Sequence, residues 1–307
     1  VKAIDTRAPV KLVWTREDDM RAGWYRPMYL HRLEAGLDAD GRPVAWRHRI
    51  VGQSIAVGTP FEGALIKDGV DVTSVEGASN LPYAIPNIDV ELHSPELPVP
   101  VQWWRSVGST HTAFAVETFI DRLASAAGRD PVEFRRSLLQ EHPRHLGVLE
   151  LAAEKAGWGS PLAAGRGRGI AVHESFNSFV AQVAEVSVRP DGTFSVDRVV
   201  IAVDCGIAVN PDIVRAQMEG GMGFGLSAAL HSELTLEKGR VVQSNFHDYR
   251  VLRMEQMPQV EVHIVRSAEP PTGVGEPATP VIAPAVANAL ANATGQHFDR
   301  LPLVLSA

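Results

Sequence analysis

Apolar and polar residues alternate on both sides of an Asp-Gly pair in two stretches of the chain, residues 28–52 and 179–206. Alternation with a period of two turns one face of a strand inward, and an Asp-Gly pair between two such runs is typical of a β-hairpin. A third hairpin pattern spans residues 232–244, and residues 88–94 and 260–265 alternate as further strands. We therefore expect two hairpin-based mixed sheets in which most strands pair antiparallel.

A different spacing, of three and four residues, marks the helices. Apolar residues repeat in this way over 116–127, and Gly128 ends the pattern. Asp130 and Asn210 each stand directly before a proline, an order that favours a helix cap followed by the first helical position. Residues 145–158 form another helical pattern. Strands and helices in these runs predict an α+β fold.

The order of these patterns divides the chain into two α+β subdomains, each a hairpin-based sheet followed by helices. We place the first at residues 1–160, with the segment WWRSVG, and the second at 161–307, with the segment GVGEP. The boundary falls in a loop-like stretch, 158–169, whose glycine-arginine run GRGRG we interpret as a plain loop.

Composition and charge argue against several classes of function. The 307 residues are 45% hydrophobic and 21% charged, with a formal net charge of −7, so clustered positive charge for nucleic acid or an anionic membrane is not expected. No apolar run approaches the ~18 residues of a membrane helix, so we expect no direct membrane insertion. Cys205 is the only cysteine, which excludes a disulfide, an iron–sulfur cluster or a cysteine-rich zinc site held by this chain alone.

The first residues indicate a chain that starts inside a larger unit. Val1 is not methionine, and residues 1–14 run directly into a β-rich segment without a polar fringe. We therefore expect that further polypeptide belongs to the same folded unit.

Several chemical motifs have plain structural explanations. The run GGMGFG at 220–225 lies in a helical pattern rather than directly after a strand, and no phosphate-loop lysine follows it, so close helix packing explains it better than nucleotide binding. The acids near the second hairpin, such as Asp204 and Glu185, form no evident catalytic pair. The histidines show no metal-ligand spacing, so we expect no metal site made by this chain's side chains.

Two motifs are more suggestive. In WWRSVG, Arg105 follows two tryptophans and precedes a bend of small residues that leads into a helix, an arrangement that fits an anion. A buried tryptophan pair explains the same residues equally well. In GVGEP, Glu276 stands between two glycines and a proline, which from the residues alone is a surface turn or a tightly held carboxylate.

Four segments, in this order, resemble the large subunit of the xanthine oxidase family of molybdenum hydroxylases, above all the isoquinoline 1-oxidoreductase beta-subunit type, which includes membrane-associated aldehyde dehydrogenases. They are WWRSVG with residues 113–139, residues 202–230, residues 244–265, and residues 273–290. The resemblance covers essentially the whole chain. It implies an α+β fold of the molybdenum hydroxylase large-subunit type, of which only the C-terminal portion is present.

The resemblance also implies an activity and a cofactor. Such enzymes use a molybdopterin cofactor, here expected as the cytosine dinucleotide, to oxidise an aldehyde or an N-heterocyclic aromatic at an electron-poor carbon with oxygen from water. Glu276 matches the catalytic glutamate that takes the proton from the hydroxide on the metal. The cofactor-binding positions carried over are Trp104, Arg105, Ser106, Val107, Gly108, Gln217, Gly273, Val274 and Gly275. Trp104 replaces a phenylalanine of xanthine oxidases, and the residues that grip purines are missing, so xanthine is not the expected substrate.

A general base must lie within hydrogen-bond reach of its proton, which explains why this carboxylate would be held tightly. Gly273 and Gly275 would let the backbone approach the cofactor, and Pro277 would stiffen the exit. We expect a helix to begin near Thr279 and Pro280, where its N-terminus would favour the ionised carboxylate.

Two glycine-rich segments that line the cofactor in this family have no counterpart here. We therefore expect activity only with the N-terminal portion of the large subunit, as a separate chain, together with a small 2Fe-2S subunit and, as the candidate electron acceptor, a c-type cytochrome. The alternative is a non-catalytic assembly fragment, which the retention of both Arg105 and Glu276 disfavours. Relatives with an export signal make the periplasm the expected compartment, with the cytoplasm as the alternative.

Overall fold

The computed structural model describes residues 9–305. Residues 1–8, the first part of the stretch 1–14 on which we base the expectation of a larger unit, lie outside the described residues. The helices are α1 (Arg16–Ala22), α2 (Glu62–Leu65), α3 (Val72–Val75), α4 (Ser109–Ala126), α5 (Pro131–Leu138), α6 (Pro143–Ala156), α7 (Pro211–Leu230) and α8 (Ile282–Thr294), with a 3-10 turn at Met254–Gln256. The strands are β1 (Tyr29–Leu37), β2 (Pro43–Gly52), β3 (Ile66–Lys67), β4 (Val70–Asp71), β5 (Asn87–His93), β6 (Arg166–Ser175), β7 (Ser178–Val188), β8 (Phe194–Asp204), β9 (Leu236–Glu237), β10 (Arg240–Val241) and β11 (Gln259–Ile264).

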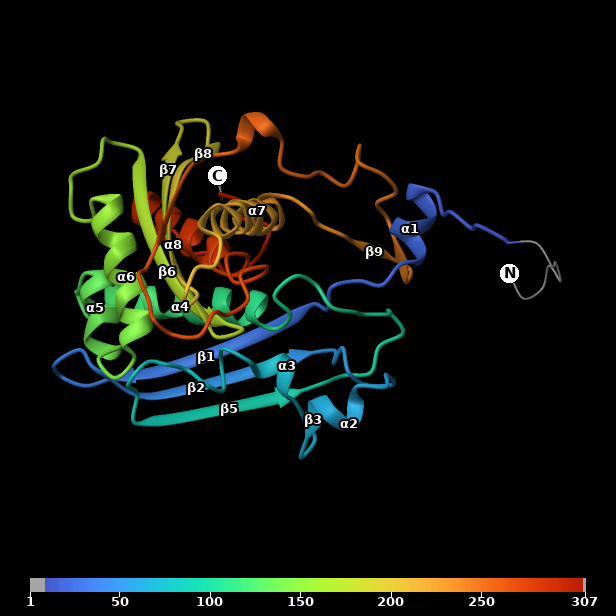
Figure 1. The fold of residues 1–307 in the computed structure, drawn as a ribbon, viewed down its shortest axis with the longest axis horizontal. Coiled ribbons are helices and arrows are strands. Elements are labelled where there is room, and N and C mark those ends of the chain that lie inside the picture. The colour runs from blue at the N-terminus through green and yellow to red at the C-terminus, as the bar shows by residue number, and fades with distance from the viewer. Residues whose placement is uncertain (1–8, 306–307) are drawn as a thin grey trace.

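The larger sheet has four strands in the order β11-β8-β7-β6. Strands β6, β7 and β8 pair antiparallel, and β11 joins β8 in parallel. Alternate residues of β6 face two hydrophobic clusters: Ala171 packs with α7 and α8, whereas Ile170 and Val172 pack with α4, α5 and α6. Helices α6 and α8 therefore cover opposite faces of this sheet (Figure 1).

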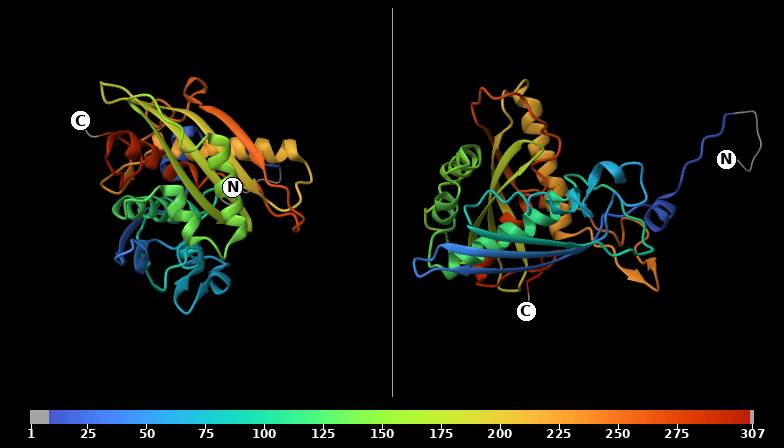
Figure 2. Two further views of the ribbon diagram at one scale, coloured as in Figure 1. Left: turned by 90° about the vertical axis from the view of Figure 1, so that its left-hand side faces the viewer. Right: turned by 90° about the horizontal axis from the view of Figure 1, so that it is seen from below.

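The smaller sheet has three strands in the order β1-β2-β5, with β1 and β2 as the predicted antiparallel hairpin and β5 added in parallel. Helix α4 contacts β1 on one side and α8 and β6 on the other, so it lies between the two sheets (Figure 2). The expected α+β class with mixed, hairpin-based sheets is confirmed. The division at residues 160 and 161 falls in the connection from α6 to β6 and stays a prediction.

Two helix starts agree with their sequence signals. The Asp130 side chain accepts hydrogen bonds from the backbone N–H groups of Val132 (2.8 Å) and Glu133 (3.1 Å) at the start of α5. The Asn210 side chain caps α7 in the same way. The predicted start of α8 is wrong, because Val281 is its N-cap and the helix begins at Ile282. Residues 277–281 instead form turns, the first closed by Thr279 N–H donating to the Glu276 carbonyl (2.9 Å).

The loop interpretation of GRGRG is wrong, because residues 166–169 form the first part of β6. Its glycines are explained by packing. A Cβ atom on Gly167 or Gly169 would overlap the backbone of Ala289 in α8, so the two glycines let this helix lie directly on the strand. Two glycines of GGMGFG, Gly221 and Gly225, have the packing role predicted for the run. A Cβ on Gly221 would lie 3.2 Å from Ala278, and one on Gly225 would overlap the Thr279 carbonyl.

Candidate functional site

The tertiary structure brings WWRSVG and GVGEP into direct contact, although they lie 170 residues apart. Arg105 is the first connection. Its Nε donates to the Gly275 carbonyl oxygen (2.7 Å), and its Nη2 donates to the same oxygen and to Gln217 Oε1 (3.1 Å). One guanidinium therefore joins the turn before α4, the face of α7 and the segment before α8.

Glu276 is the second connection. Its Oε2 accepts a hydrogen bond from the Ser106 backbone N–H at 2.6 Å, and its backbone carbonyl accepts one from Ser106 Oγ at 2.7 Å. The Glu276 side chain is only partly buried. Its carboxylate is thus fixed through one oxygen, while Oε1 has no hydrogen-bond partner among the described residues. This arrangement can hold a proton acceptor in one place and leave it reachable.

The turn that presents the Ser106 amide is strained. Ser106 and Val107 both have positive φ angles, 74° and 49°, which non-glycine residues rarely adopt. A Cβ on the next residue, Gly108, would overlap the Thr73 carbonyl oxygen, so the turn lies against α3. The sequence showed a bend of small residues here but not its left-handed conformation.

Two side chains of β7 donate hydrogen bonds to the backbone of GVGEP and of the residue that follows it. Ser178 Oγ donates to the Gly273 carbonyl (2.7 Å), and Gln182 Nε2 donates to the Ala278 carbonyl (2.7 Å). Val274 packs against the hydrophobic cluster to which residues of α7 and α8 belong. Sequence reasoning missed Ser178 and Gln182, and no local signal marks them, because their role depends on which strand lies beneath the segment.

An aromatic group borders the site. The ring of Trp104 lies 4.7 Å from that of Phe224 in α7, and the Arg26 guanidinium lies 4.4 Å from the Trp104 ring. Phe224 is 43% exposed. Neither Phe224 nor Arg26 is among the residues predicted from the sequence. A signal for Phe224 existed, since Gln217, Gly221 and Phe224 are spaced four and three apart and share one face of a helix.

These residues fit a ligand that lies against the backbone. Gly273 and Gly275 are exposed, neither has positive φ, and a Cβ on either would meet no atom within 4 Å. Nothing within residues 9–305 therefore requires glycine at these positions, whereas a bound group at close range would. Among the same residues, no group of three or more His, Cys, Asp or Glu side chains is arranged to hold a metal ion.

The other acids and histidines considered from the sequence are engaged elsewhere. Asp204 is paired with Arg144 (2.7 Å), and Glu185 with Arg168 (2.8 Å). Burial lowers the pKa of His173 to about 4 and that of His145, which also lies beside His173, to about 3. None of them contacts Arg105 or Glu276.

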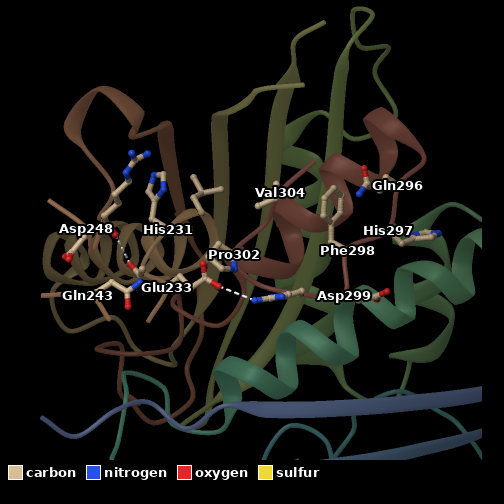
Figure 3. A pocket seen from close by; sticks show the side chains of 14 residues that line it. His231, Glu233, Gln243, Asp248, Gln296, His297, Phe298, Asp299, Pro302 and Val304 are labelled. Atoms are coloured by element: carbon tan, nitrogen blue, oxygen red, sulfur yellow. Dashed lines mark hydrogen bonds and ion pairs between the residues drawn. The ribbon is translucent and has the colours of Figure 1, made fainter. Parts of the chain in front are cut away.

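A cleft of about 630 Å³ opens elsewhere, between the end of α7 and residues 296–304 (Figure 3). It contains none of the predicted site residues. Its side chains carry both signs of charge, and the Glu233–Arg300 ion pair (3.2 Å) crosses it. We therefore place the candidate site at the contact of WWRSVG and GVGEP.

Comparison with known proteins shows which family this chain is similar to. Two models of a molybdopterin cofactor-binding domain match residues 1–139 and 111–258. The beta subunit of isoquinoline 1-oxidoreductase from Brevundimonas diminuta is 36% identical over 299 residues, which are 96% of this chain and 38% of that protein. The membrane-bound aldehyde dehydrogenase (pyrroloquinoline-quinone) of Gluconacetobacter polyoxogenes is 30% identical, over 96% of this chain and 41% of its own length. The chain thus spans well under half the length of these relatives.

Solved structures show the same fold. Quinoline 2-oxidoreductase from Pseudomonas putida 86 superimposes with a TM-score of 0.79 at 14% identity, covering 94% of this chain and 62% of that one. The aldehyde oxidoreductase of Desulfovibrio gigas gives a TM-score of 0.74 at 15% identity, covering 94% and 49%.

Proposed function

Because the chain belongs to the xanthine oxidase family of molybdenum hydroxylases and corresponds to the C-terminal part of its large subunit, we propose that it forms one wall of a molybdopterin site in which Glu276 is the general base. The reaction is the oxidation of an aldehyde or an N-heterocyclic aromatic at an electron-poor carbon. Oxygen from water is inserted, and two electrons and two protons are released.

The hydrogen bond from Ser106 N–H to Glu276 Oε2 (2.6 Å) is the observation that carries this proposal. A general base needs a fixed position, and a backbone N–H that donates to one oxygen of the carboxylate holds it in place. The free Oε1 is then the atom that accepts the proton. Arg105 holds the carbonyl of the preceding residue and so fixes the backbone that carries the Glu276 side chain.

The bound cofactor would supply two-electron acceptance, which no side chain of this chain can provide. Trp104–Gly108, Gln217 and Gly273–Gly275 would hold it. The exposed glycine backbone offers close approach, and the partly exposed Phe224 ring offers an apolar surface for an aromatic substrate. We expect the cofactor to be molybdopterin cytosine dinucleotide, because this form is the usual one in bacterial members of the family.

We further propose that the chain acts in a complex. The partners are the N-terminal portion of the large subunit, a 2Fe-2S subunit that receives the electrons, and a c-type cytochrome as acceptor. Relatives named as single subunits, of an isoquinoline 1-oxidoreductase and of a nicotinate dehydrogenase, support a multi-subunit enzyme. None of the helices within residues 9–305 is long and apolar enough to cross a membrane. A periplasmic location is our expectation, and cell fractionation tests it.

The test uses the assembled enzyme, purified through a tag on this chain. Metal analysis should find molybdenum in the wild-type complex. An aldehyde or an N-heterocycle should reduce the molybdenum centre of that complex in a single turnover. Glu276→Gln should keep assembly and molybdenum but lower this rate by at least about a thousandfold, toward the upper end of the ~10²–10⁴-fold that a positioned general base contributes.

Glu269→Gln is the matched control, because Glu269 lies in the same connection but is exposed and does not contact the site. It should react like the parent. A Glu276→Gln rate within about tenfold of the parent would remove Glu276 from the role of base. A complex that assembles but never contains molybdenum would instead support the non-catalytic alternative.

A further inference from the structure

The strained turn at Ser106 and Val107 is held by contacts on two sides, and only one of these two sets of contacts is made by Glu276, the proposed base. On that side, Ser106 contacts Glu276 through its N–H and its hydroxyl. Two consecutive non-glycine residues with positive φ keep this conformation only if surrounding contacts enforce it. The position of the Ser106 amide therefore depends on what holds the opposite side.

Glu76 holds the opposite side. Its Oε1 accepts hydrogen bonds from the backbone N–H groups of Gly108 (2.7 Å) and Ser109 (3.1 Å), the N-cap and first residue of α4. Its backbone carbonyl accepts one from Thr112 Oγ1 (2.7 Å) in the same helix. Gly108 has no side chain that could cap α4, so a residue 32 positions earlier in the chain supplies the acceptor.

The carboxyl of Glu76 is partly buried in this contact. Burial raises its pKa to about 7, with the two backbone N–H groups opposing the shift and the charges of Asp71 and Glu174 adding to it. A carboxylate kept in such surroundings is unfavourable unless its hydrogen bonds compensate. Because the carboxyl binds the two backbone N–H groups that directly follow the left-handed turn, its role is more than to add charge to the protein surface.

We propose that Glu76 is a positioning residue for Glu276, which it orients by fixing the start of α4 and thereby the Ser106 amide that binds the Glu276 carboxylate. This inference rests on the proposed function. The chain of contacts runs from Glu76 to the N–H groups of Gly108 and Ser109, through the left-handed turn, to Ser106 N–H and Glu276 Oε2.

The competing explanation is an ordinary helix cap that stabilises α4 and does nothing else. Asp130 is a matched control for that role, because its carboxylate also accepts two backbone N–H groups at a helix start, that of α5. Asp130→Ala should therefore cost stability without affecting the reaction. Glu76→Ala should lower the single-turnover rate at least about tenfold below that of Asp130→Ala at equal molybdenum content. Glu76→Gln, which keeps an acceptor oxygen, should restore most of the rate.

Two further measurements locate the effect. In the Glu276→Gln background, Glu76→Ala should lower the rate less than about twofold, because a residue that acts only through Glu276 loses its influence when the carboxylate is absent. In the assembled enzyme, hydrogen exchange resolved at single amides should be at least about tenfold faster at Ser106 in Glu76→Ala than in the parent.

An equal rate loss in both backgrounds, or an unchanged Ser106 exchange rate, would overturn the proposal. If Glu276→Gln alone leaves the rate unchanged, the base role fails, and Ser106 exchange still decides whether Glu76 holds the turn. Should Glu76→Ala not assemble, Glu76→Asp, whose shorter side chain cannot reach both amides, is measured in the same way with the same expected direction.

Discussion

Arg105 uses Nε and Nη2 inside the protein, for the Gly275 carbonyl and Gln217. From the sequence we expected Arg105 to bind an anion and to belong to the cofactor site. The contacts add a second way in which it would support binding, because they place the exposed glycine backbone. Lysine cannot replace the planar fork, which reaches α7 and the segment before α8 at once.

We therefore predict that Arg105→Lys lowers the molybdenum content of the purified complex and that Arg105→Ala lowers it further. Arg215→Ala is the control, since Arg215 is exposed on the same helix α7 and pairs only with Asp212 within the described residues. Metal analysis per complex checks the prediction. Equal molybdenum in all four proteins would show that Arg105 does not support cofactor binding.

At the scale of elements, a buried ionic network joins α4, α5 and β6. Arg135 is fully buried, and its Nε donates to Glu117 Oε2 (3.0 Å). The same Oε2 accepts the backbone N–H of Val172 in β6 (3.0 Å), and Glu117 Oε1 accepts the Tyr83 hydroxyl (2.6 Å). Loss of one partner would leave the other charge buried without compensation.

Arg135→Ala should therefore lower the free energy of unfolding by about 3–5 kcal/mol, whereas exposed pairs contribute about 0–1 kcal/mol. Arg136 is the adjacent control, because it is partly exposed and pairs with Glu133 and Glu150 on the surface of α5 and α6. Urea unfolding of the complex, followed through peptides of α4 and α5 by hydrogen exchange, compares the two. Similar losses for Arg135→Ala and Arg136→Ala would contradict the assignment.

A second element-scale feature is a row of histidines between the smaller sheet and α4. His31 Nδ1 lies 2.8 Å from His48 Nε2, and His31 Nε2 lies 3.1 Å from His111 Nδ1. Burial, aided by the neighbouring His48, lowers the pKa of His31 to about 3, and burial lowers that of His48 to about 4. The pKa of His111 also falls well below its usual value through burial, with the His31 and Arg26 charges adding to the effect.

Because these rings are neutral when folded and accept protons when unfolded, their stabilising contribution is complete above the unfolded pKa and is lost as pH falls toward the folded values. Between pH 7 and about pH 5 each should cost on the order of 1–2 kcal/mol. His48→Gln should lose less stability than the parent over this range, measured by urea midpoints. The pKa of Glu76 is raised, so its contribution to stability changes with pH in the opposite sense. Because the parent and His48→Gln both contain Glu76, the comparison between them removes its effect. Parallel losses would exclude His48 as a contributor.

At the scale of the whole molecule, apolar side chains are exposed at one end. The end consists of residues 10–14, α1 with residues 23–25 after it, and the β9–β10 hairpin, with the nearby segment 97–103 (Figure 1). Its most exposed large apolar side chains are Leu12, Val13, Trp14, Trp24, Leu97 and Leu236. An exposed apolar surface of this kind favours contact with another polypeptide, and the curated relatives are more than twice as long as the matched region.

We predict that this end is buried against the rest of the large subunit in an interface of obligate size, over ~2,000 Å². Expressed without partners, the chain should self-associate in sedimentation experiments, and co-expression should recover a defined complex. Trp24→Ser should weaken the complex, whereas Val304→Ser, at a site equally exposed but outside this end, should not. A monodisperse, folded monomer without partners would contradict the prediction.

Local signals in the sequence determined most of the elements and the identity of the family. Alternation with Asp-Gly turns predicted both main hairpins, and the Asp130 and Asn210 caps predicted two helix starts, because strand pairing across a tight turn and helix capping involve residues close in the chain. The ordered motifs then indicated the molybdenum hydroxylase resemblance and singled out Arg105 and Glu276.

Only the tertiary structure decided what those two residues touch. The bond between Ser106 and Glu276 joins residues 170 positions apart, and the bond from Glu76 to Gly108 joins residues 32 apart. The same holds for GRGRG, whose glycines look like a loop until α8 lies on β6. The physical reason is that such contacts depend on how the sheets and helices pack, and the residues that make them carry no periodic or local signal of their partner.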